Sequence, residues 1–438
     1  MITRGGVVFG VVLTLGCGDG AQVAQPASPF GPAAVVSAST SNGATPMFLV
    51  AANGNTVLSW VAAPNDGGDG ALYVRTESPD GALVTSGLRD PLGGIEPHGE
   101  APPQVAAGPD GEIYALYTVG KDVGGRYPAS ALRFARSDDA GKSWSTPVSI
   151  NEGEAFGAHS FHALIAGPDG TVYASWIDNN SASQGVWLRA SRDGGRSWEE
   201  SRRVYGEPTC PCCRTALALA KDGTLFLAWR AVVPGDVRDI VVMRSKDGGA
   251  TWSTPVRPRT DDWVFPGCPH AGPSLKVDRT GAVHLSWWTG KPGAAGVWYA
   301  RSLDGGVTWT STAIDTAGTP RAAHIQLALS GDNVVIGWDG GHDGPPGVFL
   351  RASGDRGVSF GPLLRLSEPA VAATFPVLGV VRDSLTVAWT QIGDAAYRAL
   401  IEAQREPEGE HEHMALPRVG QQEVFARKAA VAALPVRP

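Results

Sequence analysis

The residues best suited to chemistry in this sequence are cysteines and histidines that fall in loops. One loop reads Thr209-Cys-Pro-Cys-Cys-Arg214 and a later one reads Gly267-Cys-Pro-His270. Thiolate and imidazole are ligands that Cu(I) and Zn(II) prefer, so these loops predict a possible copper or zinc site. The candidate metal ligands are Cys210, Cys212, Cys213, Cys268, His159 and His270.

The same four cysteines have a second interpretation. An even number of cysteines in an exported chain favours disulfides, and four cysteines allow three pairings. Neighbouring residues lie only about 3.8 Å apart at Cα, which is short for an unstrained bridge, so Cys212 and Cys213 are expected to pair with Cys210 and Cys268 instead. Two disulfides are the favoured prediction, with the metal site and free or redox-active thiols as alternatives.

Four segments carry a polar residue or a cysteine at the same distance before a hairpin turn, so these residues are expected at the same height along the axis. Four hairpins turn at a glycine, namely Gly111, Gly170, Gly223 and Gly281. The residues eleven positions before them are Glu100, His159, Cys212 and His270. Nearby loops and strand ends add ligand-binding candidates at His162, Arg214, Arg230 and His324, and a polar run at Asp178-Asn179-Asn180. Buried structural histidines and internal ion pairs are the alternative for each of these residues.

The elements that must position these residues form a repeat. The pattern Ser-x-Asp-x-Gly-x-(Ser/Thr)-Trp begins at Ser137, Ser191, Ser245 and Ser302, and a fifth copy from Ser353 ends in Phe. Its Asp can accept backbone amides in a tight turn, its Gly can adopt positive φ, and its aromatic residue can anchor a hairpin. The structural pairs are Asp139 and Trp144, Asp193 and Trp198, Asp247 and Trp252, Asp304 and Trp309, and Asp355 and Phe360.

A second hairpin lies between successive octapeptides, and its second strand closes on an aromatic residue. These aromatics are Trp60, Tyr117, Trp176, Trp229, Trp287, Trp338 and Trp389, which recur roughly every 51 to 59 residues. One unit therefore holds four strands, A to D, as in a propeller blade. The prediction is an all-β propeller over 33–405, with seven blades favoured and six as the alternative. One more strand is expected near 396–403, and the run 33–38 is expected to close the ring.

Strand direction assigns the loops to faces. The A–B turns and the C–D turns, which hold the octapeptides, share one face, and the B–C and D–A connections share the other. The D–A loops are the longer ones, and loops on a rigid scaffold concentrate binding and chemistry. We therefore expect a site on the D–A loop face, around the axis.

The octapeptide resembles the Asp box of the sialidase/neuraminidase superfamily, also called the BNR repeat. The resemblance covers about 33–405 and implies a propeller, while function varies widely on this fold. Sialidases of the superfamily use three arginines, an Asp, and a Tyr activated by a Glu, with an Arg-Ile-Pro element near the start. This sequence has no Arg-Ile-Pro, and Tyr397 is its only tyrosine after Tyr299. No catalytic set maps onto it, so exo-sialidase activity is not expected.

The ends of the chain predict export. Residues 1–16 resemble a signal peptide, and Leu13-Thr-Leu-Gly-Cys17 resembles a lipobox that would make Cys17 the lipidated first residue. Residues 17–32 are expected to form a flexible tether and 406–438 a charged, irregular tail. Lipid anchoring in a bacterial envelope is favoured, and a secreted protein is the alternative.

Composition narrows the functional classes. The net charge is −7 and the sequence shows no basic stripe, which argues against nucleic-acid binding. The favoured function is a monomeric, non-catalytic binding protein for a glycan, protein or metal. The alternatives are an exo-sialidase or another glycoside hydrolase, and a metal-binding or thiol-redox protein.

Overall fold

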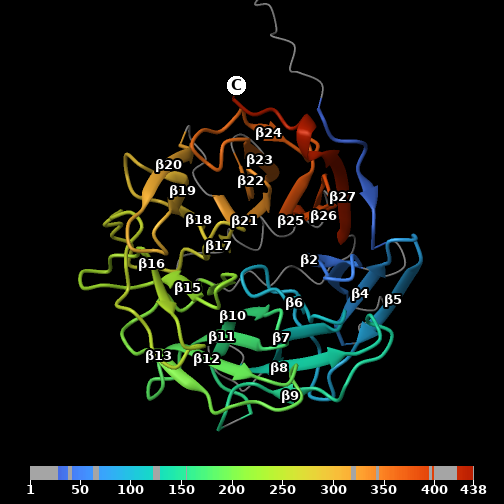
Figure 1. The fold of residues 1–438 in the computed structure, drawn as a ribbon, viewed down its shortest axis with the longest axis vertical. Helices are drawn as coiled ribbons and strands as arrows, with labels where there is room; N and C mark the ends of the chain where they lie inside the picture. The colour runs from blue at the N-terminus through green and yellow to red at the C-terminus, as the bar shows by residue number, and fades with distance from the viewer. Residues whose placement is uncertain are drawn as a thin grey trace, which may run out of the picture.

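The computed structural model describes residues 28–37, 42–62, 69–121, 129–153, 155–316, 322–341, 345–393, 397–398 and 422–437. The chain is all-β with 1% helix, and its seven blades form a ring (Figure 1). The prediction of a seven-bladed propeller is confirmed, and the six-bladed alternative is wrong.

The strands follow the predicted repeat. Blades 1 to 3 contain β2 (Ala44–Val50), β3 (Thr56–Ala62), β4 (Ala71–Glu77) and β5 (Leu83–Leu88); β6 (Gln104–Ala107), β7 (Ile113–Lys121), β8 (Ala129–Ser137) and β9 (Val148–Ser149); and β10 (His159–Ala166), β11 (Val172–Asp178), β12 (Gly185–Ser191) and β13 (Arg202–Tyr205). Blades 4 and 5 contain β14 (Ala216–Leu219), β15 (Leu225–Arg230) and β16 (Ile240–Ser245), then β17 (Ser274–Val277), β18 (Val283–Thr289), β19 (Gly296–Ser302) and β20 (Thr310–Asp315). Blade 6 contains β21 (Ala322–Ser330), β22 (Asn333–Gly340), β23 (Gly347–Ser353) and β24 (Leu364–Arg365).

In blade 4 the fourth strand is reduced to a single bridge. Val242 and Val256 exchange two backbone hydrogen bonds of 2.9 Å, which occupies the outer edge of β16. The inner strand of each blade lies nearest the axis, and the D strand forms the rim (Figure 1).

Blade 7 differs from the sequence-based expectation in its third strand. It contains β25 (Ala372–Val381), β26 (Ser384–Ile392), β27 (Gln422–Ala430) and β1 (Ala34–Val35), in that order outward, and the short 3-10 helix η1 (Val431–Ala433) follows. The third strand of this blade is β27, which pairs with β26; of the expected strand near 396–403 only Tyr397 and Arg398 are among the described residues, and they are helical. The propeller therefore extends past 405, and the expected irregular tail is wrong at 422–430. Ring closure by the N-terminal strand is confirmed, since Ala34 pairs with Ala426.

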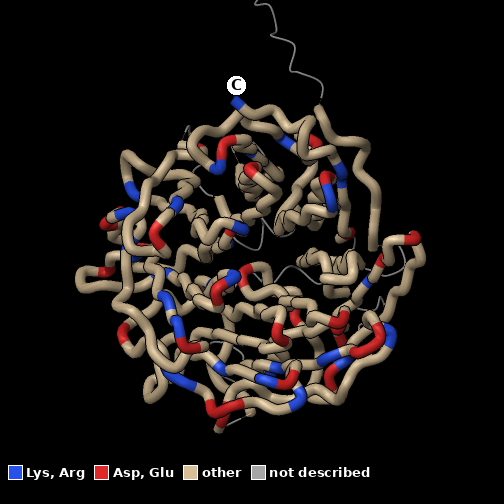
Figure 2. Tube along the Cα trace, viewed as in Figure 1, with Lys and Arg blue, Asp and Glu red and all other residues tan. Residues whose placement is uncertain are grey.

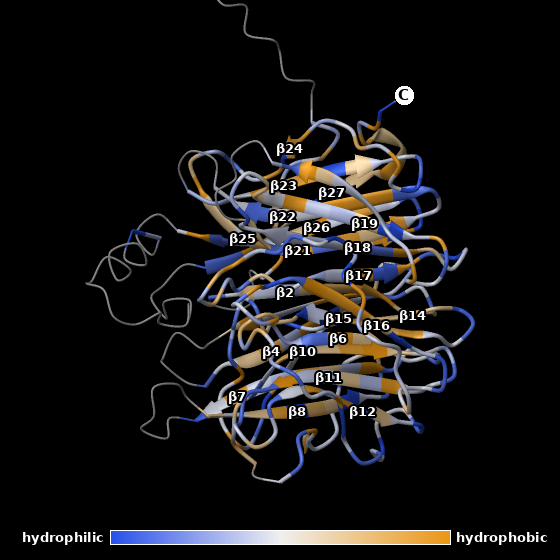
Figure 3. Cartoon of the chain, turned by 90° about the vertical axis from the view of Figure 1, so that its left-hand side faces the viewer, coloured by the Kyte–Doolittle hydropathy of each residue, from blue (hydrophilic) through white to orange (hydrophobic). Residues whose placement is uncertain are grey.

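The core lies between adjacent blades. The closing aromatics, including Trp60, Trp229 and Trp389, are among the largest fully buried side chains. Figure 3 shows apolar and polar residues mixed along the strands, and some second strands, such as β11 and β15, are buried along their whole length. Burying such an indole stabilises the fold by an amount on the order of 2–3 kcal/mol.

The octapeptides form the tight turns that their residue types predict. In the third blade Ser197 donates to Asp193 through its amide at 2.8 Å and its hydroxyl at 2.5 Å, and Gly195 donates to the Ser191 hydroxyl at 2.8 Å. The hydrogen bonds from Ser197 hold the pKa of Asp193 at about 2. Trp198 packs edge-on against Phe134 of the preceding blade, so this box contributes to the contact between blades 2 and 3.

Charges of both signs are interspersed around the ring (Figure 2). Over the part of the chain that the structure describes, no helix is long and apolar enough to cross a membrane. Cys17 and the residues up to 27 lie outside the described residues.

Candidate functional site

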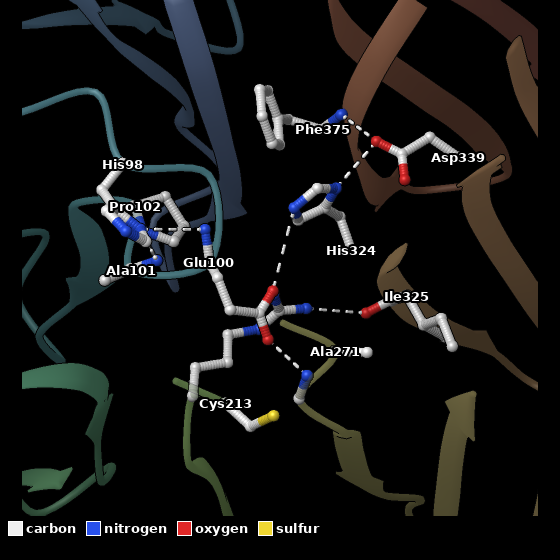
Figure 4. A network of polar contacts seen from close by, with 12 residues as sticks. His98, Glu100, Ala101, Pro102, Cys213, Ala271, His324, Ile325, Asp339 and Phe375 are labelled. Atoms are coloured by element: carbon white, nitrogen blue, oxygen red, sulfur yellow. Dashed lines mark hydrogen bonds and ion pairs between the residues drawn. The ribbon is translucent and has the colours of Figure 1, made fainter. Parts of the chain in front are cut away.

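Glu100 is the centre of a polar network near the axis (Figure 4). Its Oε2 accepts a hydrogen bond of 2.9 Å from Arg214 Nη1, and its Oε1 accepts one from the backbone amide of Gly272. Arg214 Nη2 donates to the carbonyl of Ile325 at 3.0 Å. These residues lie in the loops or first strand of blades 2, 4, 5 and 6. One carboxylate and one guanidinium therefore connect four blades.

His324 extends this network to blade 7. Its Nε2 lies 3.8 Å from Glu100 Oε2 and its Nδ1 lies 2.8 Å from Asp339 Oδ2, which also accepts the amide of Phe375 at 2.7 Å. His324 has a φ of 49° at a bulge in β21. Thr45, Phe161 and Phe375 have the same positive φ at bulges in three other inner strands, so this strained backbone belongs to the repeat rather than to His324 alone.

The predicted register set is split: Glu100 bonds Arg214, whereas Cys212 lies with the other thiols and His159 beside Asp178. The ligand-binding candidates Glu100, Arg214 and His324 do meet near the axis, where all three are buried and bonded within the protein. His162 is fully buried in blade 3, where its Nε2 lies 3.1 Å from the carbonyl of Leu116. Burial lowers the pKa of His162 to about 4, so it is neutral at pH 7 and donates this hydrogen bond.

Arg230 is buried beneath the cysteine loop. Its guanidinium donates to the carbonyls of Arg238 at 2.8 Å, Ala271 at 2.9 Å and Trp288 at 2.7 Å. His270, in the loop before β17, is half-buried with a φ of 48°.

The cysteine loop gathers its thiols as predicted, but the four cysteines are free. Cys210 Sγ lies 3.1 Å from Cys213 Sγ and 3.6 Å from Cys212 Sγ, beyond the roughly 2.05 Å of a disulfide. Cys268 contacts the Cys212 thiol from the neighbouring loop. The prediction of disulfides is thus not met in the structure, while the predicted approach of the two loops is confirmed.

The thiols differ in how readily they ionise. Burial opposes ionisation of Cys210, yet hydrogen bonds from Cys212 and Cys213 outweigh it and hold the pKa of Cys210 well below its usual value. Burial raises the pKa of Cys213 to about 12. A hydrogen bond from Cys212 lowers the pKa of Cys268 to about 7. The contacts between the sulfurs therefore favour ionisation of Cys210 and Cys268 over that of Cys213.

A cavity of about 640 Å³ opens beside blade 3, on the D–A loop face. The stacked indoles of Trp176 and Trp187 line one side, with ring centroids 6.2 Å apart. His159 and Asp178 are cross-strand partners in the same wall, with His159 Nδ1 3.3 Å from Asp178 Oδ2. Burial opposes ionisation of Asp178, but its contacts with the His159 imidazole and the Asn180 amide lower its pKa.

The opposite side of the cavity comes from the loop after β9. Glu152 accepts from the Ser201 hydroxyl at 2.6 Å and lies 3.1 Å from Arg189 Nη2, so its carboxylate is held in place. The other polar residues lining the cavity are Asn151, Asn180, Ser183 and Ser201. Gly157 leaves room for His159, because a Cβ there would lie 2.6 Å from its Nε2.

Comparison with blade 5 shows what is particular to this cavity. Trp298 is the counterpart of Trp187: each indole donates to the carbonyl four residues earlier, at 2.9 and 2.8 Å. The guanidinium of Arg259 lies 3.3 Å from the ring centre of Trp298 and covers it. Trp187 instead faces the cavity. Trp187 thus lines an open cavity, whereas the equivalent aromatic face in blade 5 is covered by the protein.

Sequence reasoning found only part of this cavity. It named His159 and the run Asp178-Asn179-Asn180, but it placed His159 with the cysteines near the axis. Trp187 and Glu152 were missed. The usable signal was the alternation of β12, which places Trp187 opposite the closing aromatic Trp176.

Comparison with known proteins supports the fold. The BNR repeat-like domain model matches residues 96–263 and 186–374, which together span more than half of the chain. No curated protein sequence matches significantly. Similar solved structures include an ulvan lyase (14% identity, 80% of this chain and 92% of that chain, TM-score 0.52). They also include the polysaccharide lyase Uly1 (14%, 88% and 89%, 0.52) and the Hadza microbial sialidase Hz136 (18%, 73% and 71%, 0.45). The chain belongs to the BNR repeat-like domain family, with a sialidase-like seven-bladed propeller fold.

Proposed function

We propose that this propeller binds a saccharide in the cavity between blades 2 and 3. The observation that carries the proposal is the uncovered indole of Trp187 in a cavity of about 640 Å³ that also contains fixed polar groups. This volume lies within the usual range for small-ligand sites, which runs from roughly 300 to 1,000 Å³. The ligand site therefore lies on the D–A loop face, but beside blade 3 rather than on the axis.

The two kinds of wall suit the two kinds of surface on a sugar ring. An indole offers a flat apolar face against which the C–H face of a pyranose can pack. Glu152 and Asn180 offer acceptors and donors for hydroxyl groups, and Arg189 and Ser201 hold the Glu152 carboxylate in place. Preorganised polar groups give specificity because an analogue lacking the matching hydroxyl leaves them unpaired.

The axial residues are less suited to this role. The carboxylate of Glu100 and the guanidinium of Arg214 already bond each other and neighbouring backbone groups, and they are 2% and 6% exposed. A ligand there must replace hydrogen bonds of two buried charged groups, whereas the Glu152 side chain in the cavity beside blade 3 is 43% exposed. Internal pairing thus favours the cavity over the axis.

A catalytic role in the same cavity is the second candidate. His159 and Asp178 form a buried imidazole–carboxylate pair that could take a proton from a bound sugar, and Glu152 provides a second carboxylate. The ulvan lyase and Uly1 have this fold, but at 14% identity they support the fold alone. A glycoside hydrolase or polysaccharide lyase remains the alternative to a binding protein.

The proposed setting is the bacterial envelope. Lipidation at Cys17 would hold the propeller at a membrane surface facing the periplasm or the exterior, as a monomer. This proposal rests on the lipobox-like sequence alone.

The test is a glycan array followed by calorimetry with the best-binding oligosaccharide. Trp187→Ala should weaken binding by about ten-fold or more, because a stacking surface is lost. Trp298→Ala is the matched control and should leave affinity unchanged, since Arg259 already covers that ring. Equal affinity for wild type and Trp187→Ala would contradict the proposed site. Slow cleavage of the bound glycan, abolished by His159→Ala, would instead favour the enzymatic candidate.

A further inference from the structure

We propose that Cys210, Cys212 and Cys213 form a buried thiolate site for one thiophilic cation, Cu(I) or Zn(II), with Cys268 as the fourth ligand. The inference is independent of the saccharide proposal. The three thiol groups lie within 4.8 Å of one another, and the three cysteines are at most 1% exposed. Cys268 reaches Cys212 from the loop before blade 5.

The spacing of the sulfurs suits a four-coordinate ion. Four sulfurs placed about 2.3 Å from a central zinc lie about 3.8 Å from one another. Cys210 Sγ and Cys212 Sγ are 3.6 Å apart, close to that edge length. Cys210 Sγ and Cys213 Sγ are 3.1 Å apart. They need to separate by about 0.7 Å to accommodate the ion. Each thiol that binds loses its proton to solvent.

The ligand type selects the metal class. The cluster contains sulfur alone, and it is shielded from water, which disfavours Mg²⁺ and Ca²⁺ because these ions take oxygen ligands. Soft thiolates select Cu(I) and Zn(II). Both ions have the same ligand chemistry here, so metal competition must distinguish them.

The surrounding charge favours an anionic centre. Arg230 is 1% exposed and its hydrogen bonds go to backbone carbonyls, so its charge is buried without a carboxylate hydrogen-bonded to it. Arg238 is also buried and donates through Nε to the carbonyl of Phe265. A tetrathiolate zinc centre carries two negative charges, and two neighbouring guanidinium groups would balance them.

The cysteine loop is held in place before any ion binds. Cys210 donates its amide to the carbonyl of Arg230 at 2.9 Å, and Thr215 donates to the carbonyl of Phe161 at 3.0 Å. Asn179 Nδ2 donates to the carbonyl of Pro211 at 3.0 Å. A preformed site of this kind loses little conformational entropy on binding. Because Cys213 directly precedes Arg214, the ion would also fix the arginine that pairs with Glu100.

The experiment measures metal content of the full chain purified under anaerobic conditions. The protein is loaded with Zn(II) or with Cu(I), then dialysed against EDTA or bathocuproine disulfonate respectively. We expect about one ion per chain for the preferred metal. Reconstitution with Co(II) should give the intense sulfur-to-cobalt absorption and visible bands of a tetrahedral thiolate site.

Variants separate the site from nonspecific binding. Cys210→Ser and Cys213→Ser should abolish stoichiometric binding, and Cys268→Ser should weaken it and change the cobalt bands. Cys17→Ser is the matched control and should bind as wild type does.

Circular dichroism of each variant confirms folding, and intact mass gives the thiol state. A folded wild type that binds no ion would overturn the proposal. So would a mass lower by two hydrogens, which indicates a disulfide, or unchanged binding by folded Cys210→Ser.

Discussion

Arg214 donates a 2.9 Å hydrogen bond to Glu100, although the two residues lie 114 positions apart in the chain. Both side chains are buried, at 8% and 2% exposure. The pair connects the loop before blade 2 to the loop before blade 4, and Arg214 also bonds Ile325 in blade 6. The axis of this propeller is therefore held by an ionic connection as well as by apolar packing between blades.

Replacing Glu100 by Gln should destabilise the fold strongly. The substitution leaves Arg214 as a buried charge without its counter-ion, which costs on the order of 3–5 kcal/mol. Chemical denaturation at pH 7 measures the change in the free energy of unfolding. The control is Asp332→Asn, which removes an exposed pair with Arg356 and should leave stability close to wild type. Similar stability of the two variants would mean that the Glu100 network does not hold the axis.

Stability should fall as the pH drops below about 6.5, because of His162. Burial lowers the pKa of this histidine to about 4 in the folded protein, against 6.5 in the unfolded chain. Between these values the unfolded state binds a proton that the folded state does not. The contribution of His162 to the free energy of unfolding is therefore complete above about pH 6.5 and is lost progressively toward pH 4. The loss from this group amounts to about 3 kcal/mol.

His162→Gln tests this attribution. Gln cannot titrate, so the free energy of unfolding of the variant should depend less on pH between 7 and 4.5 than that of wild type. Among the described residues His284 is a second buried histidine with a lowered pKa, so some dependence should remain. Identical pH profiles for wild type and variant would show that His162 does not contribute in this range.

The purified protein should lack strong exo-sialidase activity. The superfamily's reaction needs arginines free to bind a substrate carboxylate, whereas Arg214 and Arg230 use their donors on internal partners. A fluorogenic sialoside measures the activity. Robust release of sialic acid that is lost in Tyr397→Phe would show that the expectation is wrong.

Cys17→Ser should release the protein from the membrane fraction. The expectation is that lipidation at this residue attaches the chain, and cell fractionation with immunoblotting detects the shift. A wild-type protein that is already soluble and begins after Cys17 would show that the chain is secreted without a lipid anchor.

The repeat could be predicted from sequence because its signals are local. Each octapeptide carries its own turn chemistry, as in the bonds from Ser197 to Asp193, and each closing aromatic fills the core beside its own strand. The third strand of blade 7 was missed for the opposite reason. Residues 422–430 follow a charged segment, and their partner β26 ends 30 residues earlier at Ile392.

The candidate sites depend on contacts that sequence spacing does not encode. Glu100 and His159 share one register, yet Glu100 bonds Arg214 at the axis while His159 pairs with Asp178 in a cavity. Whether an aromatic face is open depends on which side chain reaches it. Arg259 covers Trp298 from 39 residues away, and the cavity leaves Trp187 open. The cysteines were predictable as a group because three of them are neighbours in one loop.

The most direct test of the proposed function is a crystal structure of the protein soaked with its best-binding oligosaccharide. The account predicts a sugar ring packed on the indole of Trp187, with hydroxyl groups hydrogen-bonded to Glu152 and Asn180. A sugar bound at the axis against Glu100 and Arg214, with the cavity beside blade 3 empty, would contradict it.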